Sequence, residues 1–340
     1  MARAAAVPAW HRVASLRSLR SAGFGILAMV LIAPLGFLGD YQLFRLTLIA
    51  TYALALLGLN LVMGFGGQIS LGHGAFYASG AYTTAILMTS AGVPYWATLP
   101  CAGAAGAALG FLVGWPALRL RGHYLALITL ALATAIPQAL KCKALEPWTG
   151  GVQGVIIDKP GAPFGLPLSP DGWLYLLALA ITAVAFTLVA NLLRGRIGRA
   201  IVAVRDHTLA AEAMGVHVAR LKTRTFALSA ALTALAGSLG ALETEFVSPD
   251  SFTVFLSITL FVGSVVGGVA SIGGAVAGAV FIVMVPPLAN SVSRAAPGAV
   301  YGVILIACLY LMPSGIAGLL RRAAASSWWR KRKRGGEHVA

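Results

Sequence analysis

The sequence predicts an all-α integral membrane protein with about ten transmembrane helices, from its composition and its pattern of apolar segments. Hydrophobic residues make up 59% of the 340 residues and charged residues only 10%, and the mean hydropathy is +0.85. Soluble domains carry roughly 25% charged residues. A soluble fold of this length has too little interior to cover so much apolar surface, so lipid must surround most of the chain.

Ten segments are long and apolar enough to cross a bilayer, for which a helix needs about 20 residues. They lie near residues 22–39, 43–63, 74–91, 96–116, 122–140, 172–193, 223–242, 252–269, 273–290 and 299–319. The first follows Arg17 and Arg20 in the manner of a signal peptide, but its end, LGFLGD, offers no small-x-small cleavage site. We therefore interpret it as the first membrane helix.

The distribution of charge predicts the orientation of these helices. If the N-terminus is cytoplasmic and the spans alternate, most of the 25 Lys and Arg residues fall on the cytoplasmic face, as the positive-inside rule requires. The exceptions are Arg45, Lys141, Lys143, Lys159 and Arg294. We therefore expect an even number of spans with both termini in the cytoplasm. No Asp or Glu is expected deep in a span, and Glu243 is assigned to the outer side.

The net charge of +15 does not indicate a nucleic-acid-binding protein. Much of it is concentrated in two segments beside apolar spans, 194–224 and 321–334, and such juxtamembrane clusters set topology and contact anionic lipid. Cys101, Cys142 and Cys308 are far apart and show no CxxC spacing. The cysteines therefore predict neither a disulfide framework nor a zinc site.

Five glycines crowd the stretch that joins the second and third apolar segments. They are Gly64, Gly66, Gly67, Gly72 and Gly74, with the polar residues Asn60, Gln68, Ser70 and His73 among or beside them. So many glycines are not compatible with a regular helix. Irregular backbone at membrane depth must be buried in protein or line a wet cavity. The stretch is therefore either a gate-lining break between two helices or a tight cytoplasmic turn.

A second glycine-rich stretch has Gly263 and Gly267, then Gly274 and Gly278, each pair four residues apart. Small residues at this spacing let helices approach closely, so we expect helix packing here. The alternative, a phosphate-binding loop, fails because no Lys follows a Gly anywhere in the chain. The chain therefore has no Walker A motif with which to bind ATP.

The basic segment 194–224 contains the sequence TLAAEAMG at 208–215, which predicts a short helix. Alanine is the best helix former, and Gly215 is a natural stop. Exposed on the cytoplasmic face, this helix would either dock a soluble partner or lie on anionic lipid. The residues alone do not choose between these two roles.

These segments together resemble the branched-chain amino acid ABC transporter permease family, specifically its LivM-type subunit. The similarity is carried by GFGGQISLGHGAFYASGAY at 64–82, LRLRGHYLALITL at 118–130 and TGGVQG at 149–154. The loop 198–228 resembles the family's ATPase-coupling loop, with 210–215 as its core. The match covers roughly residues 45–320, and the basic tail after Arg321 is not part of it.

The resemblance implies a permease rather than an enzyme, with no catalytic residue, cofactor or metal of its own. It implies four partners: a second homologous permease subunit, two cytoplasmic ATP-binding subunits and a periplasmic substrate-binding protein. The domain division is then a basic N-terminus at 1–21, a permease domain at 22–320 with its coupling loop at about 194–222, and a tail at 321–340. The chain would lie in the inner membrane of a bacterium and carry branched-chain or other apolar amino acids.

The site residues follow from this interpretation. The coupling loop would use Arg205, Ala210, Ala211, Glu212, Ala213 and Gly215. The translocation path would be lined by Gln68, Ser70, His73 and Tyr82. Related permeases carry urea or short amides, which leaves the substrate open. A stand-alone ion-coupled carrier is the alternative from another class, although such carriers usually hold an ionisable group inside the bundle.

Overall fold

In the computed structural model, the described residues are 38–117, 123–163, 167–293, 296–312 and 315–319. Most of the first expected span, the start of the 118–130 stretch, the basic N-terminus 1–21 and the tail 321–340 lie outside them. Helices account for nearly all of the secondary structure, and the one sheet has two short strands. The predicted all-α membrane fold is confirmed.

The elements follow one another along the chain with short connections. They are α3 Asp40–Asn60, η1 Leu61–Phe65, α4 His73–Ala91, α5 Tyr95–Ala117, α6 His123–Leu140, α7 Glu146–Thr149, β1 Val155–Ile156, α8 Pro170–Arg194, α9 Arg196–Asp206, α10 Thr208–Ala213, α11 Val218–Thr244, β2 Phe246–Val247, η3 Pro249–Phe252, α12 Val254–Gly267, α13 Ile272–Val292 and α14 Pro297–Leu311. Each of the nine expected segments after the first therefore overlaps a helix in the described part of the chain.

The helices differ in how well they fit a membrane span. Five of the described stretches are both long and apolar enough to cross a bilayer: 40–65, 95–115, 170–194, 218–244 and 272–292. The helix α12 has only 14 residues and α14 has 15. The expected span 299–319 was wrong in extent, because α14 ends at Leu311. Met312 leaves the helical region, as expected for a residue before a proline, here Pro313.

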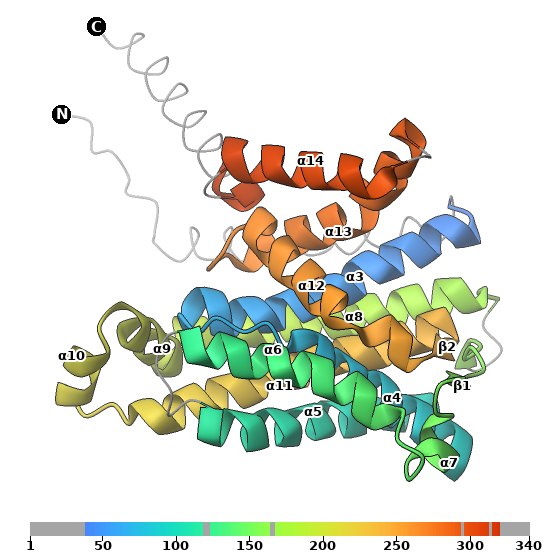
Figure 1. Cartoon of the computed structure of the whole chain (residues 1–340), viewed down its shortest axis with the longest axis horizontal. Coiled ribbons are helices and arrows are strands. Elements are labelled where there is room, and N and C mark those ends of the chain that lie inside the picture. Colours follow the sequence, from blue (N-terminus) through green and yellow to red (C-terminus); the bar gives the residue numbers. More distant parts are fainter. Residues whose placement is uncertain (1–37, 118–122, 164–166, 294–295, 313–314, 320–340) are drawn as a thin grey trace, which may run out of the picture.

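Two helices form the centre of the bundle. In the apolar windows of α3 and α11, 78% of residues are buried, against 22% in α8. The helix α11 packs on α3, α4 and α5 together, and Figure 1 shows it inside the layer that these helices build. Small residues allow this: a side chain on Gly80 would collide with the backbone of Ala234, and one on Gly237 with the backbone of Tyr77.

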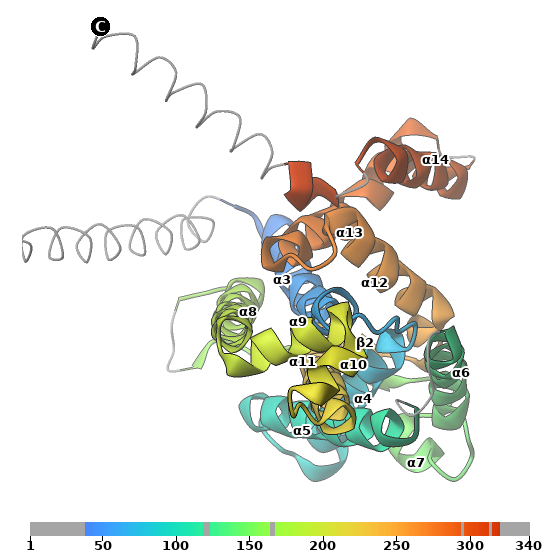
Figure 2. The same cartoon turned by 90° about the vertical axis from the view of Figure 1, so that its left-hand side faces the viewer.

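The connecting segments gather at the two ends of the bundle. The helices α9 and α10 project from one end, as Figures 1 and 2 show. The helix α7 and the strands β1 and β2 lie at the other end, where Val155 pairs with Val247 and Ile156 with Phe246. The described residues of the segment 141–169 are therefore mostly irregular, and a short antiparallel ladder fastens this segment to the end of α11.

Candidate functional site

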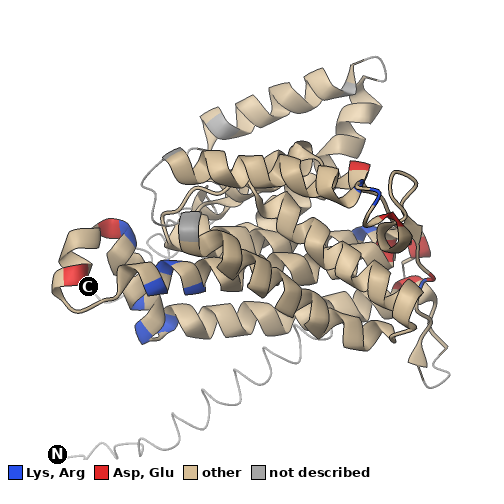
Figure 3. Cartoon of the chain, turned by 60° about the horizontal axis from the view of Figure 1, so that its bottom comes forward, with Lys and Arg blue, Asp and Glu red and all other residues tan. Residues whose placement is uncertain are grey.

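Opposite charges mark the two ends of the bundle, as Figure 3 shows. The first, which we call the basic end, carries Arg194, Arg196, Arg199, Arg205, Arg220, Lys222 and Arg224. The other, which we call the acidic end, carries Asp40, Glu146, Asp158, Asp171, Glu243, Glu245 and Asp250. This asymmetry is the pattern expected of a membrane protein whose two faces meet different compartments.

The expected short helix is present at the basic end as α10, and the chain turns after it at Gly215, where φ is +84°. A side chain other than glycine would be strained in this conformation. Ala211 is 4% exposed and packs with Val204 of α9 and Val218 of α11. Ala210, Glu212 and Ala213 are exposed on α10. The unit α9–α10 is thus seated on α11 by a small apolar cluster and presents the rest of α10 outward.

The glycine-rich stretch interrupts the helix, as predicted. The last turn of the α3 helix widens into the π-helix η1, and residues 66–72, which we call the glycine break, are not helical. Gly67 has a φ of +65°. The hydroxyl of Thr129 accepts a hydrogen bond from the N–H of Leu71 at 2.9 Å. The break is therefore only partly buried, with Gly67 and Ile69 exposed, and α6 supports it at Leu71.

Arg205 joins the unit α9–α10 to this break. Its Nη1 donates to the carbonyl oxygen of Gly64 at 3.0 Å, and its side-chain stem lies against Gly67, where a Cβ would collide with it. Its Nε also donates to Asp206 at 2.8 Å. The carbonyls at the end of a helix lack intrahelical partners, and a guanidinium satisfies them well.

Asn60, the last residue of α3, holds a second interruption, the turn at residues 268–271 between α12 and α13. Its Nδ2 donates to the carbonyl oxygen of Ser271 at 2.8 Å and more weakly to that of Gly268 at 3.4 Å. Its Oδ1 accepts from the N–H of Ala270 at 2.8 Å. Ala270 has a φ of +59°, which is unusual for a residue with a side chain. One buried amide thus holds a strained turn.

The four expected path residues do not converge on one site. Ser70 and His73 lie together, with 2.9 Å between the hydroxyl and Nδ1, and Nε2 of His73 lies 2.8 Å from the hydroxyl of Ser229. His73 is 1% exposed, so its ring is a hydrogen-bonded strut between α4 and α11. Gln68 faces α9 and the start of α11 instead. Tyr82 lies elsewhere on α4, with its ring 5.9 Å from that of Phe252.

The glycine pairs of the second stretch lie where α12 and α13 meet. A side chain on Gly267 would collide with the backbone of Gly274, and one on Gly278 with the carbonyl of Gly263. Backbones this close exclude water and lipid between the two helices. The geometry is that of a close helix pair rather than of a loop open to a phosphate.

Glu243 was expected on the outer side, and its burial was not predicted. In the structure it lies in the last turn of α11, at the acidic end, and is 2% exposed. Both carboxyl oxygens are buried without a hydrogen-bond partner among the described residues. The pairing of β1 with β2 covers this end of α11, and such pairing is not visible in the sequence. Glu243 is therefore an additional candidate functional residue.

Comparisons with known proteins agree with this architecture. The family model described as the permease component of the branched-chain amino acid transport system matches residues 42–312. The LivM permease protein of Salmonella typhimurium is 37% identical over 269 residues, 72% of this chain and 62% of that protein. The LivM protein of Escherichia coli is 37% identical over 261 residues, 70% of this chain and 61% of that protein.

The second permease type of such systems is also similar. The LivH permease protein of Escherichia coli is 26% identical over 295 residues, 82% of this chain and 94% of that protein. The chain spans about three fifths of the length of the two LivM relatives. No solved structure matches the chain. The resemblance to LivM-type permeases is thus confirmed, and this multi-pass membrane chain belongs to the family of branched-chain amino acid transport permease components.

Proposed function

We propose that the chain is a membrane-spanning subunit of an ABC importer for branched-chain or other apolar amino acids, driven by ATP hydrolysis in partner subunits. It would pair with a homologous permease subunit, two cytoplasmic ATP-binding subunits and a periplasmic binding protein in the inner membrane of a bacterium. The basic end would be cytoplasmic, because the positive-inside rule places Lys and Arg there. Both chain termini would lie on that side.

One observation carries this proposal: the unit α9–α10 stands at the basic end, and Arg205 links it to η1 by a hydrogen bond to Gly64 and to the glycine break by contact with Gly67. Exposed residues of α10 offer a docking surface to a soluble partner, while Val204, Ala211 and Val218 fix α10 to α9 and α11. A push on α10 therefore reaches Gly64 through a short, direct contact. A helix that only rested on lipid would need no such link to the interior of the bundle.

The first experiment is co-purification with a tagged ATP-binding subunit encoded beside this chain. We expect the wild-type chain to be retained and Ala211→Asp to be lost, because a buried charge would detach α10 from its apolar cluster. Val152→Asp is the matched control, since Val152 is exposed at the acidic end. A wild-type chain that ignores the ATP-binding subunit would favour a stand-alone ion-coupled carrier instead.

A second experiment tests the link itself in proteoliposomes that hold the complete transporter. We expect Arg205→Gln to keep the complex assembled and its ATPase activity near the wild-type rate, while uptake falls about tenfold through loss of one charged hydrogen bond. Arg205→Lys should recover part of the uptake, and Arg199→Gln, at an exposed position of the same helix, should change little. Wild-type uptake in Arg205→Gln would contradict the proposed role.

Two further variants address the expected loop and path residues. Gly215→Trp should assemble normally and uncouple ATP hydrolysis from uptake, because a side chain strains the turn at φ +84° without meeting any neighbouring atom. The double variant Ser70→Leu, His73→Leu should alter substrate kinetics if these residues line the path.

Substrates to compare in the same vesicles are leucine, urea and acetamide, because the last two would identify the urea or short-amide alternative.

A further inference from the structure

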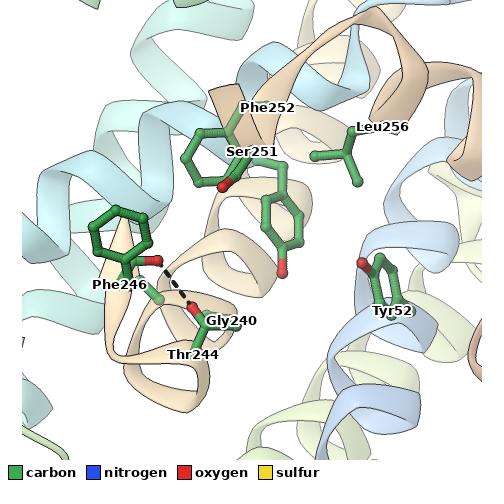
Figure 4. Close-up of a pocket in the computed structure, with 9 residues that line it drawn as sticks. Tyr52, Gly240, Thr244, Phe246, Ser251, Phe252 and Leu256 are labelled. Atoms are coloured by element: carbon green, nitrogen blue, oxygen red, sulfur yellow. Dashed lines mark hydrogen bonds between the residues drawn. The ribbon is translucent and has the colours of Figure 1, made fainter. Parts of the chain in front are cut away.

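An open pocket lies among α3, α4, α11 and α12, near the acidic end of the bundle. Its volume is about 270 Å³, slightly below the 300–1,000 Å³ of pockets that bind drug-sized molecules. Figure 4 shows Tyr52 across the gap from Phe252 and Leu256, with Thr244 and Phe246 at one side. The size of the pocket therefore suits a ligand smaller than a typical drug.

The pocket opens at the acidic end and has its floor inside the bundle. Thr244, Phe246 and Ser251 are exposed and form the rim. They belong to the end of α11 and to the short elements β2 and η3 that follow it. Tyr77 and Gly240 are buried and form the floor, and Gly240 lies in a stretch of α11 that is long and apolar enough to cross a bilayer. A small molecule can therefore enter from the aqueous phase at this end and reach membrane depth.

Aromatic rings form most of the apolar wall. Tyr52 and Tyr77 stack with 6.3 Å between ring centroids, and Phe252 lies 6.1 Å from Tyr77. Tyr82, one of the expected path residues, packs on Phe252 with 5.9 Å between centroids. Aromatic faces offer a large apolar contact area at fixed positions, and Leu256 adds an aliphatic one. The wall therefore suits an aliphatic side chain.

The floor also holds a polar group without a hydrogen-bond partner among the described residues, the hydroxyl of Tyr77. The residue is 7% exposed and lines the pocket, yet its oxygen is not among the fully buried polar atoms, so the pocket reaches it. This oxygen lies directly against Gly240, where a Cβ would collide with it. The hydroxyl of Thr244, by contrast, already donates to the carbonyl of Gly240 at 2.9 Å. Because a buried tyrosine hydroxyl usually has a partner, that of Tyr77 is available to a ligand.

We propose that this pocket holds the aliphatic side chain of the transported amino acid, and that the hydroxyl of Tyr77 hydrogen-bonds to a polar group beside that side chain. An amino acid has both features, because its carboxylate and ammonium are attached to the carbon that bears the side chain. A hydroxyl can donate to the first and accept from the second. A lipid acyl chain would cover the apolar wall but leave the hydroxyl unpaired. The inference rests on the proposed function for the identity of the ligand, and deepens it by assigning a side-chain subsite at the end of the bundle opposite the unit α9–α10.

The first test compares the uptake of leucine and phenylalanine by the complete transporter in proteoliposomes. Leu256→Ala enlarges the pocket, so we expect the ratio of kcat/KM for phenylalanine to kcat/KM for leucine to rise about tenfold, since a change of one methylene in an apolar pocket has effects of this order. Leu256→Phe fills the pocket and should lower the same ratio. Leu288→Ala, at an exposed position of α13, is the matched control. An unchanged ratio in both Leu256 variants would overturn the assignment.

The second test addresses the hydroxyl of Tyr77 alone. Tyr77→Phe keeps the ring and removes the oxygen, so we expect the KM for leucine to rise about tenfold, as for the loss of one hydrogen bond to a charged group. Tyr310→Phe, at an exposed position of α14, is the matched control. A leucine KM in Tyr77→Phe equal to that of wild type would refute the role of the hydroxyl.

The third test does not depend on transport. A small maleimide labels the variant Ser251→Cys at the rim of the pocket, in the full chain purified into lipid nanodiscs, and mass spectrometry follows the rate at that position. At a leucine concentration about ten times the dissociation constant, we expect labelling to slow about tenfold, because the free fraction falls as 1/(1 + [L]/Kd). Val152→Cys, exposed at the same end but outside the pocket, should be labelled at an unchanged rate.

The outcomes of this test separate the pocket from the proposed function. Protection of Ser251→Cys by octanol but not by leucine would identify an acyl-chain site and overturn the proposal. A chain that an ATP-binding subunit retains, but that leucine does not protect, would refute the side-chain subsite alone. A chain that leucine protects, but that no ATP-binding subunit retains, would refute the proposed function alone.

Discussion

Asn60 and His73 at the basic end and Glu243 at the acidic end are all buried polar side chains, but they differ in their hydrogen bonds. At the basic end Asn60 makes three hydrogen bonds to the turn 268–271, and His73 is held by two hydroxyls. At the acidic end Glu243 is equally buried and makes none among the described residues. A satisfied polar group stabilises the fold, whereas an unsatisfied one destabilises it. Asn60 and His73 therefore stabilise the fold, whereas Glu243 does not, and the described part of the basic end also holds an unsatisfied atom, Oε1 of Gln68.

Replacement of Asn60 should have the strongest effect on the fold. In Asn60→Leu the N–H of Ala270 and the carbonyl of Ser271 lose their partner inside the bundle. We expect the free energy of unfolding to fall by about 3 kcal/mol or more, since each buried unsatisfied group costs about 1–3 kcal/mol. Thermal unfolding in detergent measures this effect. Asn290→Leu, at an exposed position of α13, is the control and should unfold near the wild-type temperature.

Replacement of Glu243 should change the free energy of unfolding in the opposite direction. In Glu243→Leu a buried group without a hydrogen bond is removed, so we expect the free energy of unfolding to rise by about 1–3 kcal/mol. The same measurement applies, with Glu245→Leu as the exposed control. A lower unfolding temperature in Glu243→Leu would mean that this carboxyl has a stabilising partner and that the contrast between the two ends does not hold.

Replacement of His73 should have an intermediate effect on the free energy of unfolding. His73→Phe keeps an aromatic ring against Phe76 and Phe226, whose centroids lie 5.5 Å and 6.3 Å from that of His73, and loses both hydrogen bonds. We expect a loss of about 1–2 kcal/mol, because Ser229 keeps its bond to the carbonyl of Gly58. A double-mutant cycle with Ser229→Ala isolates the coupling free energy between His73 and Ser229. A coupling energy of zero would show that the contact does not stabilise the fold.

Replacement of Lys159 should have the smallest effect on the free energy of unfolding, and this effect should depend on pH. Burial alone would lower the pKa of Lys159, but the hydrogen bond to Asp171 and the charges of Glu243 and Asp171 outweigh it and raise the pKa. A raised lysine pKa stabilises the fold at all pH values below the ordinary value of about 10.4, and this stabilisation is lost as the pH rises through the folded value.

We therefore expect Lys159→Met to lower stability by less than about 1 kcal/mol at pH 8, because Glu245 is half exposed and water screens the pair. The difference from wild type should shrink as the pH rises above the ordinary lysine pKa and through the raised pKa of Lys159. Unfolding temperatures across this range measure it. A difference that stays constant with pH would show that the loss in the variant comes from packing against Phe44 rather than from charge.

Local patterns were sufficient to predict most of the fold. Apolar length predicts the helices, the glycines at 64–74 predict the interruption, and TLAAEAMG predicts α10 because alanines propagate a helix and Gly215 ends it. These features depend on residues that are neighbours in the sequence. The last span was misjudged in extent because hydropathy continues past Leu311, whereas the helix does not.

The contacts between distant residues were not predictable in this way. Arg205 and Gly64 are 141 positions apart, and Asn60 and Ala270 are 210 apart. An asparagine inside an apolar segment does signal an interhelical hydrogen bond, but it does not name the partner. The burial of Glu243 was not predicted, because its acidic neighbour Glu245 suggests solvent, whereas the folded chain leaves Glu243 only 2% exposed.

The helix α11 has a mechanical consequence for both ends. Its 27 residues form a rod roughly 40 Å long, with α10 at one tip and Glu243 at the other. The rod touches the backbones of α4 and α5 most closely around Ala230, Ala234 and Gly237, where glycines of those helices leave no room for a side chain. This waist lies nearer to Thr244 than to Val218. If α11 pivots there as a rigid rod, a sideways displacement of the α10 tip moves Glu243 in the opposite direction and by a smaller distance.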